Sequence, residues 1–305
     1  FGPVPMTEAV NGEEGNFYPA FDSQQTVYET ILEDLERANS IYDTSLDMVY
    51  AEDILFHNDI ELWQKLTNAV HMRLLLRISS RTETGAFTKL AAMINNPATY
   101  PVFESTAESA ILQVTGITPN VSPWGRPQDF PLGTKMASFF VDNLNALEDP
   151  RRPIIATEAK DLAGVSLGYK GIPSAYAGSE SQFDYDASNL NREQVENPMQ
   201  IFLFTYAEVE FIKAEMAQRG YTSNAEVHYQ NGVKGAIEQL ETEITPDYFE
   251  NPLLPTTEAM LNDGIMPARF QYPSDVQISN ASNYGAALEL LGGDDSINTK
   301  VWWDN

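Results

Sequence analysis

Aromatic residues set in glycine-rich sequence are the part of this chain best suited to binding a ligand. The segment 164–189 is rich in glycine and tyrosine, and its candidate ligand-binding residues are Tyr169, Tyr176, Phe183, Asp184, Tyr185 and Asn189. Aromatic rings stack on the apolar faces of sugars, while Asp and Asn side chains bond to hydroxyl groups. We therefore predict a carbohydrate or peptide surface here. The alternative is that these loops only cover a core.

A second candidate is Trp124, which lies in the run Ser122-Pro123-Trp124-Gly125-Arg126-Pro127. The sequence from Pro97 to about Pro131 is rich in Pro, Thr, Ser and Gly and is expected to form a long irregular loop. Long loops within compact domains are often functional. Trp124 is therefore added to the predicted ligand surface, with a ring that packs the loop onto the core as the alternative.

The spacing of catalytic residue types does not indicate an enzyme. With 44 acidic residues, accidental carboxylate pairs such as Asp294-Asp295 or Glu208 and Glu210 are expected. The three histidines show no metal-binding spacing, and there is no cysteine. Nucleotide-binding and nucleophile motifs are also absent from the sequence. We expect no catalysis, no metal and no cofactor, and we retain a carboxylate-pair glycoside hydrolase as a less favoured alternative.

The charge of the chain excludes some partners. The sequence has 305 residues and a formal net charge of −26, with a pI near 4.3. Such a surface repels phosphate backbones and anionic lipid headgroups, so nucleic acid is not an expected partner. No apolar run approaches the roughly 20 residues that cross a bilayer. A hydrophobic content of 43% is enough for a sizeable core.

The elements that would position these residues are mainly helices. Apolar residues recur at three- and four-residue steps over 22–41, 59–81, 87–95, 136–147, 201–219 and 225–240. Asp22 or Ser23 is the expected N-cap of the first helix, and Gly220 the left-handed C-cap of the fifth. The last two helices are joined by a short turn, which predicts an antiparallel pair of the tetratricopeptide type.

Three arginines form a basic edge on one predicted helix. Arg73, Arg77 and Arg81 follow at four-residue steps within 59–81. They could bind an anion, or they could pair with acidic neighbours and bury their aliphatic stems.

Several stretches of the sequence have the character of motifs. They are Phe1 to Ala9, Phe21 to Tyr28, the helix from Leu62 and Trp63 through Asn68 to Arg73 and Arg77, Tyr206 to Val209, and the terminal Pro267-x-Arg269-Phe270-x-Tyr272-Pro273 with Lys300-Val301-Trp302-Trp303. Together they resemble the SusD/RagB superfamily of outer-membrane nutrient-binding lipoproteins, in its starch-binding-associating group. Because the ending is shared with the family, Trp302 and Trp303 are expected to pin the terminus to the helices rather than to hold the ligand.

The resemblance implies a mainly α fold of tetratricopeptide-like helix pairs with long irregular loops and little β structure, here as a single domain over 1–305. It implies a binding protein without enzyme activity, which captures oligosaccharide and delivers it to a SusC-like TonB-dependent outer-membrane transporter. A peptide-binding helical-repeat lid or scaffold of such a transporter is the alternative. The implied location is the cell surface, with attachment to the outer membrane through a lipidated N-terminal cysteine that this sequence lacks. The family's N-terminal part and a segment before Pro267 are also expected to be missing.

Overall fold

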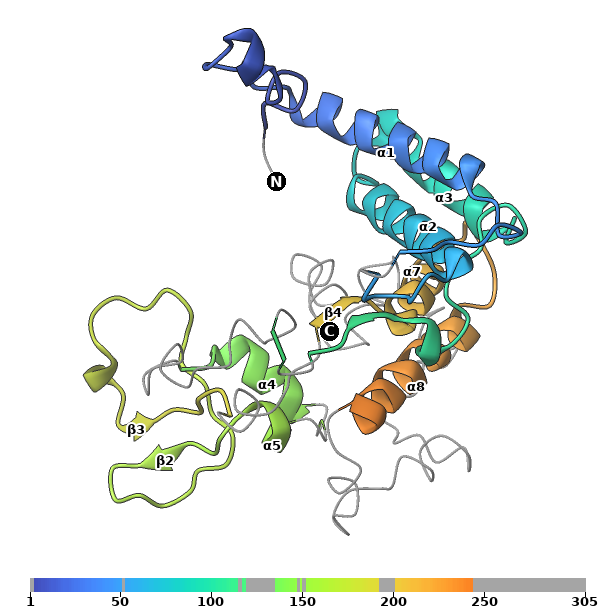
Figure 1. Cartoon of the computed structure of the whole chain (residues 1–305). Coiled ribbons are helices and arrows are strands. Elements are labelled where there is room, and N and C mark those ends of the chain that lie inside the picture. Colours follow the sequence, from blue (N-terminus) through green and yellow to red (C-terminus); the bar gives the residue numbers. More distant parts are fainter. Residues whose placement is uncertain are drawn as a thin grey trace. The chain divides into compact units, whose positions relative to one another are not determined.

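The computed structural model describes residues 3–50, 53–114, 117–118, 135–146, 149, 152–191 and 201–243 (Figure 1). Trp124, Trp302, Trp303 and the Pro267 motif lie outside these residues. The chain divides into two compact units, the first formed by residues 1–110 and 202–236 and the second by residues 111–201 and 237–305. The assignment of the whole chain to a single domain stays a prediction.

The first unit is built from helices, which confirms the predicted mainly α fold. Its helices are α1 (Gln24–Ile41), α2 (Ile60–Arg77), α3 (Ala86–Ile94), α7 (Tyr206–Gln218) and the larger part of α8 (Ala225–Glu243), whose residues from Ile237 are assigned to the second unit. Short 3-10 turns lie at Asn11–Glu14, Thr82–Thr84 and Thr106–Glu108. None of the helices in the described part of the chain is both long and apolar enough to cross a membrane.

Polar caps fix where the helices begin. The Ser23 side chain accepts a hydrogen bond from the amide of Thr26 at the start of α1, as predicted. Asp22, the other candidate cap, instead accepts bonds from the amide and hydroxyl of Thr7. Asp59 caps α2 by accepting from the amide of Leu62.

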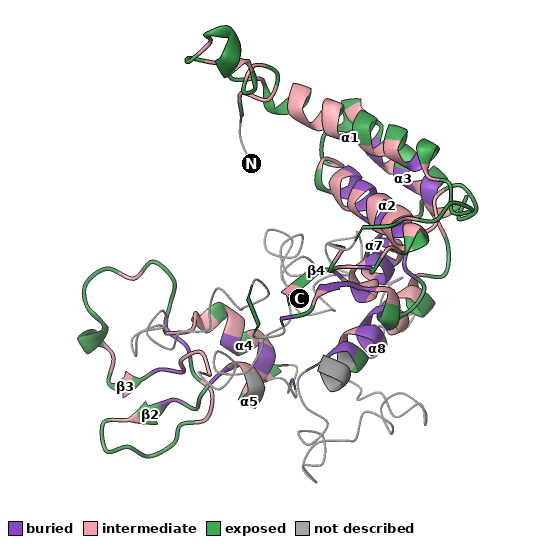
Figure 2. Ribbon diagram, viewed as in Figure 1, coloured by how far each residue is buried: buried purple, intermediate pink, exposed green. Residues whose placement is uncertain are grey.

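Helix α2 lies among α1, α3 and α7, each of which contacts it. Its buried residues are therefore not confined to the predicted apolar stripe and are Lys65, Asn68, Ala69, His71, Met72, Leu75 and Leu76 (Figure 2). Only Leu75 is fully buried among the apolar residues predicted to face inward, which are Leu62, Trp63, Leu66, Val70, Leu74, Leu75 and Ile78. The helix also ends at Arg77, so Arg81 belongs to the following turn and the three arginines do not share one helix.

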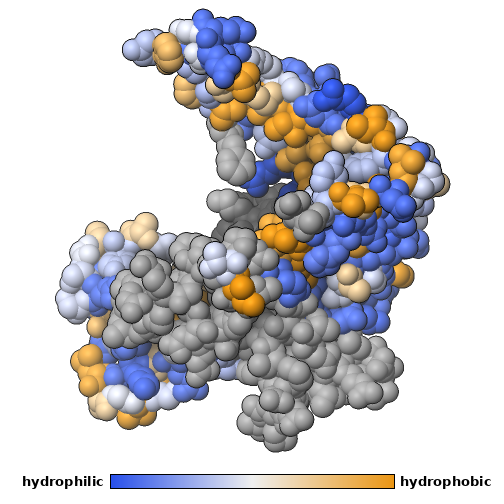
Figure 3. All heavy atoms as spheres, in the orientation of Figure 1, coloured by the Kyte–Doolittle hydropathy of each residue, from blue (hydrophilic) through white to orange (hydrophobic). Residues whose placement is uncertain are grey.

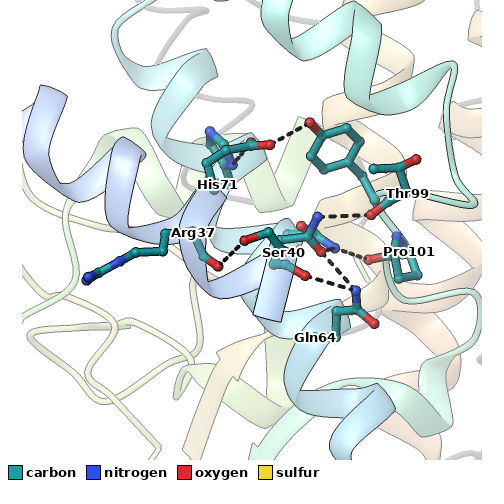
Figure 4. A network of polar contacts seen from close by, with 10 residues as sticks. Arg37, Ser40, Gln64, His71, Thr99 and Pro101 are labelled. Carbon is teal, nitrogen blue, oxygen red and sulfur yellow. Dashed lines mark hydrogen bonds and ion pairs between the residues drawn. The ribbon is translucent and has the colours of Figure 1, made fainter. Parts of the chain in front are cut away.

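A buried amide network joins α1 to α2 (Figure 4). Asn39 is the buried residue of α1, and its side-chain oxygen accepts hydrogen bonds from Gln64 at 3.0 Å and Asn68 at 2.9 Å. The amide groups of Asn39 and Asn68 in turn donate to the carbonyl oxygens of Thr99 and Pro101. Since an unpaired buried amide is costly, this network specifies how the two helices pack.

Large apolar side chains also reach the surface of the first unit, over the N-terminal arm (residues 3–22) and α1 (Figure 3). Val10 and Phe17 in the arm are 83% and 76% exposed, and Ile41 at the end of α1 is 75% exposed. The predicted apolar face of α1 is thus only partly covered by the described residues, with its core positions half-buried.

Helices α7 and α8 form the predicted antiparallel pair. Gly235 packs on Tyr206 at the start of α7, whereas Phe211, further along α7, contacts Tyr229, earlier in α8. Gly220 between them has φ +81°, as expected of a left-handed cap.

The prediction of one continuous helix over 201–219 is wrong at its start. Residues Ile201–Phe204 form strand β4, which pairs with β1 (Ala110–Leu112). Thr205 has an extended backbone and caps α7 by accepting from the amide of Glu208, so the helix cannot begin before Tyr206.

The second unit contains less regular structure. Its described elements are α4 (Ser138–Ala146), α5 (Arg152–Ile155), β2 (Lys160–Asp161), a 3-10 turn at Glu180–Gln182 and β3 (Tyr185–Asp186), with β2 and β3 paired antiparallel. Helix α4 begins later than predicted because Met136 bonds to the 170–190 segment: its amide donates to the carbonyl oxygen of Ser188, and its own carbonyl oxygen accepts from the amide of Ile172.

Candidate ligand site in the glycine- and tyrosine-rich segment

Three of the predicted aromatic residues contact one another. The rings of Tyr176 and Phe183 meet edge-to-face, with centroids 5.2 Å apart and planes at 82°. The ring centroids of Phe183 and Tyr185 lie 5.9 Å apart, and the ring planes are at 55°. All three side chains are half-buried. The geometry thus gives a row of rings from Tyr176 through Phe183 to Tyr185, with part of its surface open to solvent.

One end of the row is fixed to the body of the unit. Tyr185 lies in β3 opposite Asp161, and its hydroxyl donates to the carbonyl oxygen of Gly171 at 2.9 Å. The Lys170 ammonium nitrogen lies 3.6 Å from the centre of the Tyr185 ring, within the range of a cation–π contact. Gly171 in turn packs against the backbone of Ala137 so closely that a Cβ atom would lie 2.6 Å from its carbonyl carbon.

The other two rings belong to the loop that leads back to β3. Within this loop the Gln182 side chain donates to the carbonyl oxygens of Ala177 and Ser179, closing a compact turn. The residues around the rings are mostly exposed. Tyr176 and Phe183 therefore belong to a loop with its own internal hydrogen bonds, while Tyr185 belongs to strand β3, to which this loop is attached.

The polar candidates differ in position. Asp184 is exposed between Phe183 and Tyr185. Asn189 lies in the backbone frame, where its carbonyl accepts from the amide of Thr157 and its amide donates to the Thr157 hydroxyl. Its buried side-chain oxygen has no hydrogen-bond partner among the described residues.

Tyr169 occupies a separate place in the unit. The Arg152 guanidinium lies 5.6 Å from its ring centre, and the Tyr169 carbonyl accepts from Asn145. Burial and the charge of Glu158 raise the pKa of its hydroxyl, while Arg152 opposes the shift. Among the described residues, no ring contact joins Tyr169 to the three other rings.

The field around the ring row is acidic. Burial, with the carboxylates of Asp184 and Asp142, raises the pKa of Tyr185 above its usual range. Lys135, a nearby cation, is already paired with Asp186. The sequence patterns did not single out Lys170 and Gly171, which contact Tyr185. The one sequence signal for these two residues was their position between Tyr169 and Ile172.

Of the carboxylates considered for catalysis, Asp294 and Asp295 lie outside the described residues, and Glu208 and Glu210 are held in ion pairs of the first unit. Glu208 pairs with Arg73, which settles the role of that arginine in favour of pairing. Glu210 pairs with Lys213 and His228. In the described ranges, no group of three or more His, Asp or Glu side chains is arranged to hold a metal ion.

Comparisons with known proteins agree on one family. Residues 1–254 match the family model described as SusD-like, starch-binding associating with outer membrane. No curated protein matches the chain significantly.

Solved structures with this fold are also known. An outer membrane protein of Bacteroides vulgatus associated with nutrient binding is 24% identical, with a TM-score of 0.70 over 89% of this chain and 66% of the other. A SusD homologue from Bacteroides fragilis is 21% identical, with a TM-score of 0.71 over 95% and 62%. A chitin-binding protein is 24% identical, with a TM-score of 0.63 over 100% and 77%. The chain thus spans just under two thirds of the length of the first two.

Proposed function

Because the chain belongs to the SusD-like family of starch-binding proteins that associate with the outer membrane, we propose that it captures glycans at the cell surface. The family match over residues 1–254 is the observation that carries the proposal. The nutrient-binding and chitin-binding descriptions of structurally similar proteins agree with it.

The loop aromatic residues support a place for the glycan. Sugar-binding surfaces need rings that stack on apolar sugar faces and polar groups beside them. Tyr176 and Phe183 provide adjoining half-buried rings, and Asp184, which follows Phe183 in the sequence, provides an exposed acceptor. We place the ligand site on this loop and include Trp124, Tyr169, Tyr185 and Asn189 as further members.

The captured glycan is proposed to pass to a SusC-like TonB-dependent transporter in the outer membrane. The family description supports association with that membrane. Attachment through a lipidated cysteine would precede the residues of this sequence, which contains no cysteine. We propose a binder without catalysis, and the engagement of Glu208 and Glu210 in ion pairs is consistent with this.

Isothermal titration calorimetry with maltoheptaose, N-acetylchitohexaose and a set of short peptides tests the function. We expect at least one oligosaccharide to bind and none to be hydrolysed on prolonged incubation. Release of shorter sugars would support the glycoside hydrolase instead. Binding of peptides with no sugar affinity would support the peptide-binding scaffold.

Two variants locate the site. Tyr176→Ala and Trp124→Ala should each weaken glycan binding, by about tenfold or more where a stacked ring is lost. Tyr18→Ala is the matched control because Tyr18 is 94% exposed in the N-terminal arm of the first unit, away from the loop in sequence. Unchanged affinity in Tyr176→Ala would reject the loop as the platform.

A further inference from the structure

The three rings of the loop cannot all serve a ligand in the same way. One face of Tyr185 is covered by the Lys170 ammonium group, and the ring also contacts Phe183. Its hydroxyl is used by the Gly171 carbonyl. Tyr185 is half-buried like the other two rings, but one face and its hydroxyl are already engaged, so its contacts suit a residue that positions Phe183.

Tyr176 and Phe183 differ from Tyr185 in this respect. Their described contacts are the edge-to-face pair between them and the tilted contact of Phe183 with Tyr185. Tyr176 is the outer ring of the row, on a loop whose internal hydrogen bonds include those made by Gln182. The apolar surface left for a sugar ring is that of Tyr176 and Phe183.

The charged residues close to these two rings in the sequence are acidic. Asp184, adjacent to Phe183, and Glu180, in the 3-10 turn before it, are both exposed. Asp142 acts on the adjoining Tyr185. A negatively charged ligand would be brought within a Debye length of these exposed carboxylates, where water weakens the repulsion and salt screens it only in part.

The described cations of the second unit do not offset this field at the outer rings. Lys135 is paired with Asp186, and Arg152 donates to Asn145 and lies against Tyr169.

Lys160 faces away from the ring row. It opposes Asp186 in the β2–β3 pair, whereas Asp161 opposes Tyr185. Opposed residues of a pair share a face and successive residues alternate, so Lys160 lies on the face away from Tyr185. Lys170 is thus the described cation at the row, and it lies on the Tyr185 ring at the inner end.

We propose that Tyr176 and Phe183 bind uncharged sugar rings, that Asp184 and Glu180 exclude anionic glycans, and that Lys170 and Tyr185 position the platform. This inference rests on the proposed function and names the glycan class that the same site accepts. The ligands are neutral glucans or N-acetylated amino sugar chains, and uronic acid chains are rejected.

Titration of the unmodified chain with maltoheptaose, N-acetylchitohexaose and oligogalacturonate of similar length tests the charge preference. A sugar carboxylate that lies about 5 Å from each of the two acidic side chains loses roughly 1.5 kcal/mol of binding free energy in water. We therefore expect about tenfold weaker binding of the anionic sugar than of the neutral sugars at low salt. The difference in affinity between the neutral and the anionic sugars should become smaller at high salt. Equal or tighter binding of oligogalacturonate would overturn the inference while leaving glycan capture intact, and binding of no glycan at all would overturn the proposed function.

Charge variants identify the excluding residues. The double variant Asp184→Asn with Glu180→Gln keeps both side-chain shapes and should bring oligogalacturonate affinity to within about threefold of that for the neutral sugar. Asp43→Asn is the control, since Asp43 is an exposed carboxylate of the first unit. If the ratio of neutral-sugar affinity to oligogalacturonate affinity is unchanged in the double variant, these two carboxylates do not exclude anions.

The positioning role of Lys170 has its own readout. Lys170→Gln should weaken binding of the neutral sugar severalfold with no change in melting temperature of the helical unit, and Lys170→Arg should restore it because a guanidinium also stacks on an aromatic ring. If Lys170 instead contacts ligand directly as a cation, Lys170→Gln will weaken only oligogalacturonate, which would overturn its assignment as a positioning residue.

Discussion

Arg73 of α2 holds Glu208 of α7 with two hydrogen bonds of 2.5 Å, from Nε to Oε1 and from Nη2 to Oε2. The same guanidinium lies 3.8 Å from the centre of the Phe204 ring and donates to the carbonyl oxygen of Leu203. One side chain therefore links α2 to both the strand β4 and the helix α7 that follow each other in the chain.

Loss of this arginine should destabilise the first unit. The Arg73 and Glu208 side chains are 33% and 28% exposed, which is intermediate between a surface pair and a buried one. We therefore expect Arg73→Met to cost about 2 kcal/mol of unfolding free energy. Arg73→Lys should cost nearly as much, because a single ammonium cannot reproduce the paired bonds and the ring contact. Urea unfolding followed by circular dichroism measures both.

Arg77→Met is the matched control for that experiment. Arg77 is exposed one turn further along α2. Its removal should change stability by less than about 0.5 kcal/mol. Equal effects of the Arg73 and Arg77 variants would contradict the linking role.

Gly171→Ala should disturb the frame of the candidate ligand site. A Cβ atom there would lie 2.6 Å from Ser138 N and 2.7 Å from Ala137 O, both backbone atoms that cannot turn aside. Overpacking of this kind costs about 1 to 3 kcal/mol. Because the Gly171 carbonyl also accepts from Tyr185, glycan affinity should fall together with stability.

Gly12→Ala is the control for a new methyl group, since no atom lies within 4 Å of its Cβ position. We expect this variant to have the same melting temperature and the same sugar affinity as the unmodified chain. Normal glycan binding by Gly171→Ala would show that the frame does not position the rings.

Protonation of His71 should make the first unit less stable in mild acid. Burial lowers the pKa of His71, with Lys89 acting in the same direction and Glu36 opposing it. The unfolded chain then binds a proton at higher pH than the folded chain. The stability from this group is complete above about pH 6.5 and is lost as the pH falls below it, by up to about 1.4 kcal/mol per pH unit, until the folded-state pKa is passed.

Two variants separate this effect from general acid sensitivity. His71→Gln should flatten the decline in unfolding free energy between about pH 7 and pH 5. Glu36→Gln removes the carboxylate that opposes the shift, so the decline should extend to lower pH. Parallel pH profiles for the unmodified chain and His71→Gln would exclude His71 as the cause.

The helical elements could be predicted from sequence because their signals are local. Ser23 and Asp59 cap the helices that follow them, and Gly220 takes the left-handed conformation predicted for it. These features depend on residues within one turn of the helix end.

Features that depend on distant neighbours were missed. The run Ile201–Phe204 is short and wholly apolar, which fits a helix or a strand equally, and its pairing with β1 decides between them. Likewise Asn68 is buried in α2 because Asn39 and the Pro101 carbonyl approach it. The aromatic residues of the ligand loop were singled out from the sequence. The contact of the Lys170 ammonium group with the Tyr185 ring was not, because it depends on how the chain folds around the two residues.

The buried carboxylate of Glu210 offers a last prediction, at the contact of α7 with α8. Its side chain is 4% exposed and accepts bonds from Lys213 at 2.8 Å, His228 at 2.9 Å and Asn231 at 3.1 Å. Burial alone would raise the pKa of Glu210, but the bonds from these partners and the Lys213 charge outweigh it and lower the pKa. The ionised form is therefore the one that stabilises the helix pair.

Glu210→Gln should cost about 3 kcal/mol near neutral pH, because it leaves the Lys213 and His228 groups without their carboxylate. A lowered pKa means that the contribution is complete above about pH 4.5 and is lost as the pH falls through the folded-state value, so the variant and the unmodified chain should converge in acid. Glu226→Gln, which alters an exposed carboxylate of α8, should change stability by less than about 0.5 kcal/mol at every pH. A difference between Glu210→Gln and the unmodified chain that persists unchanged to low pH would mean that lost packing, rather than lost charge, destabilises the variant.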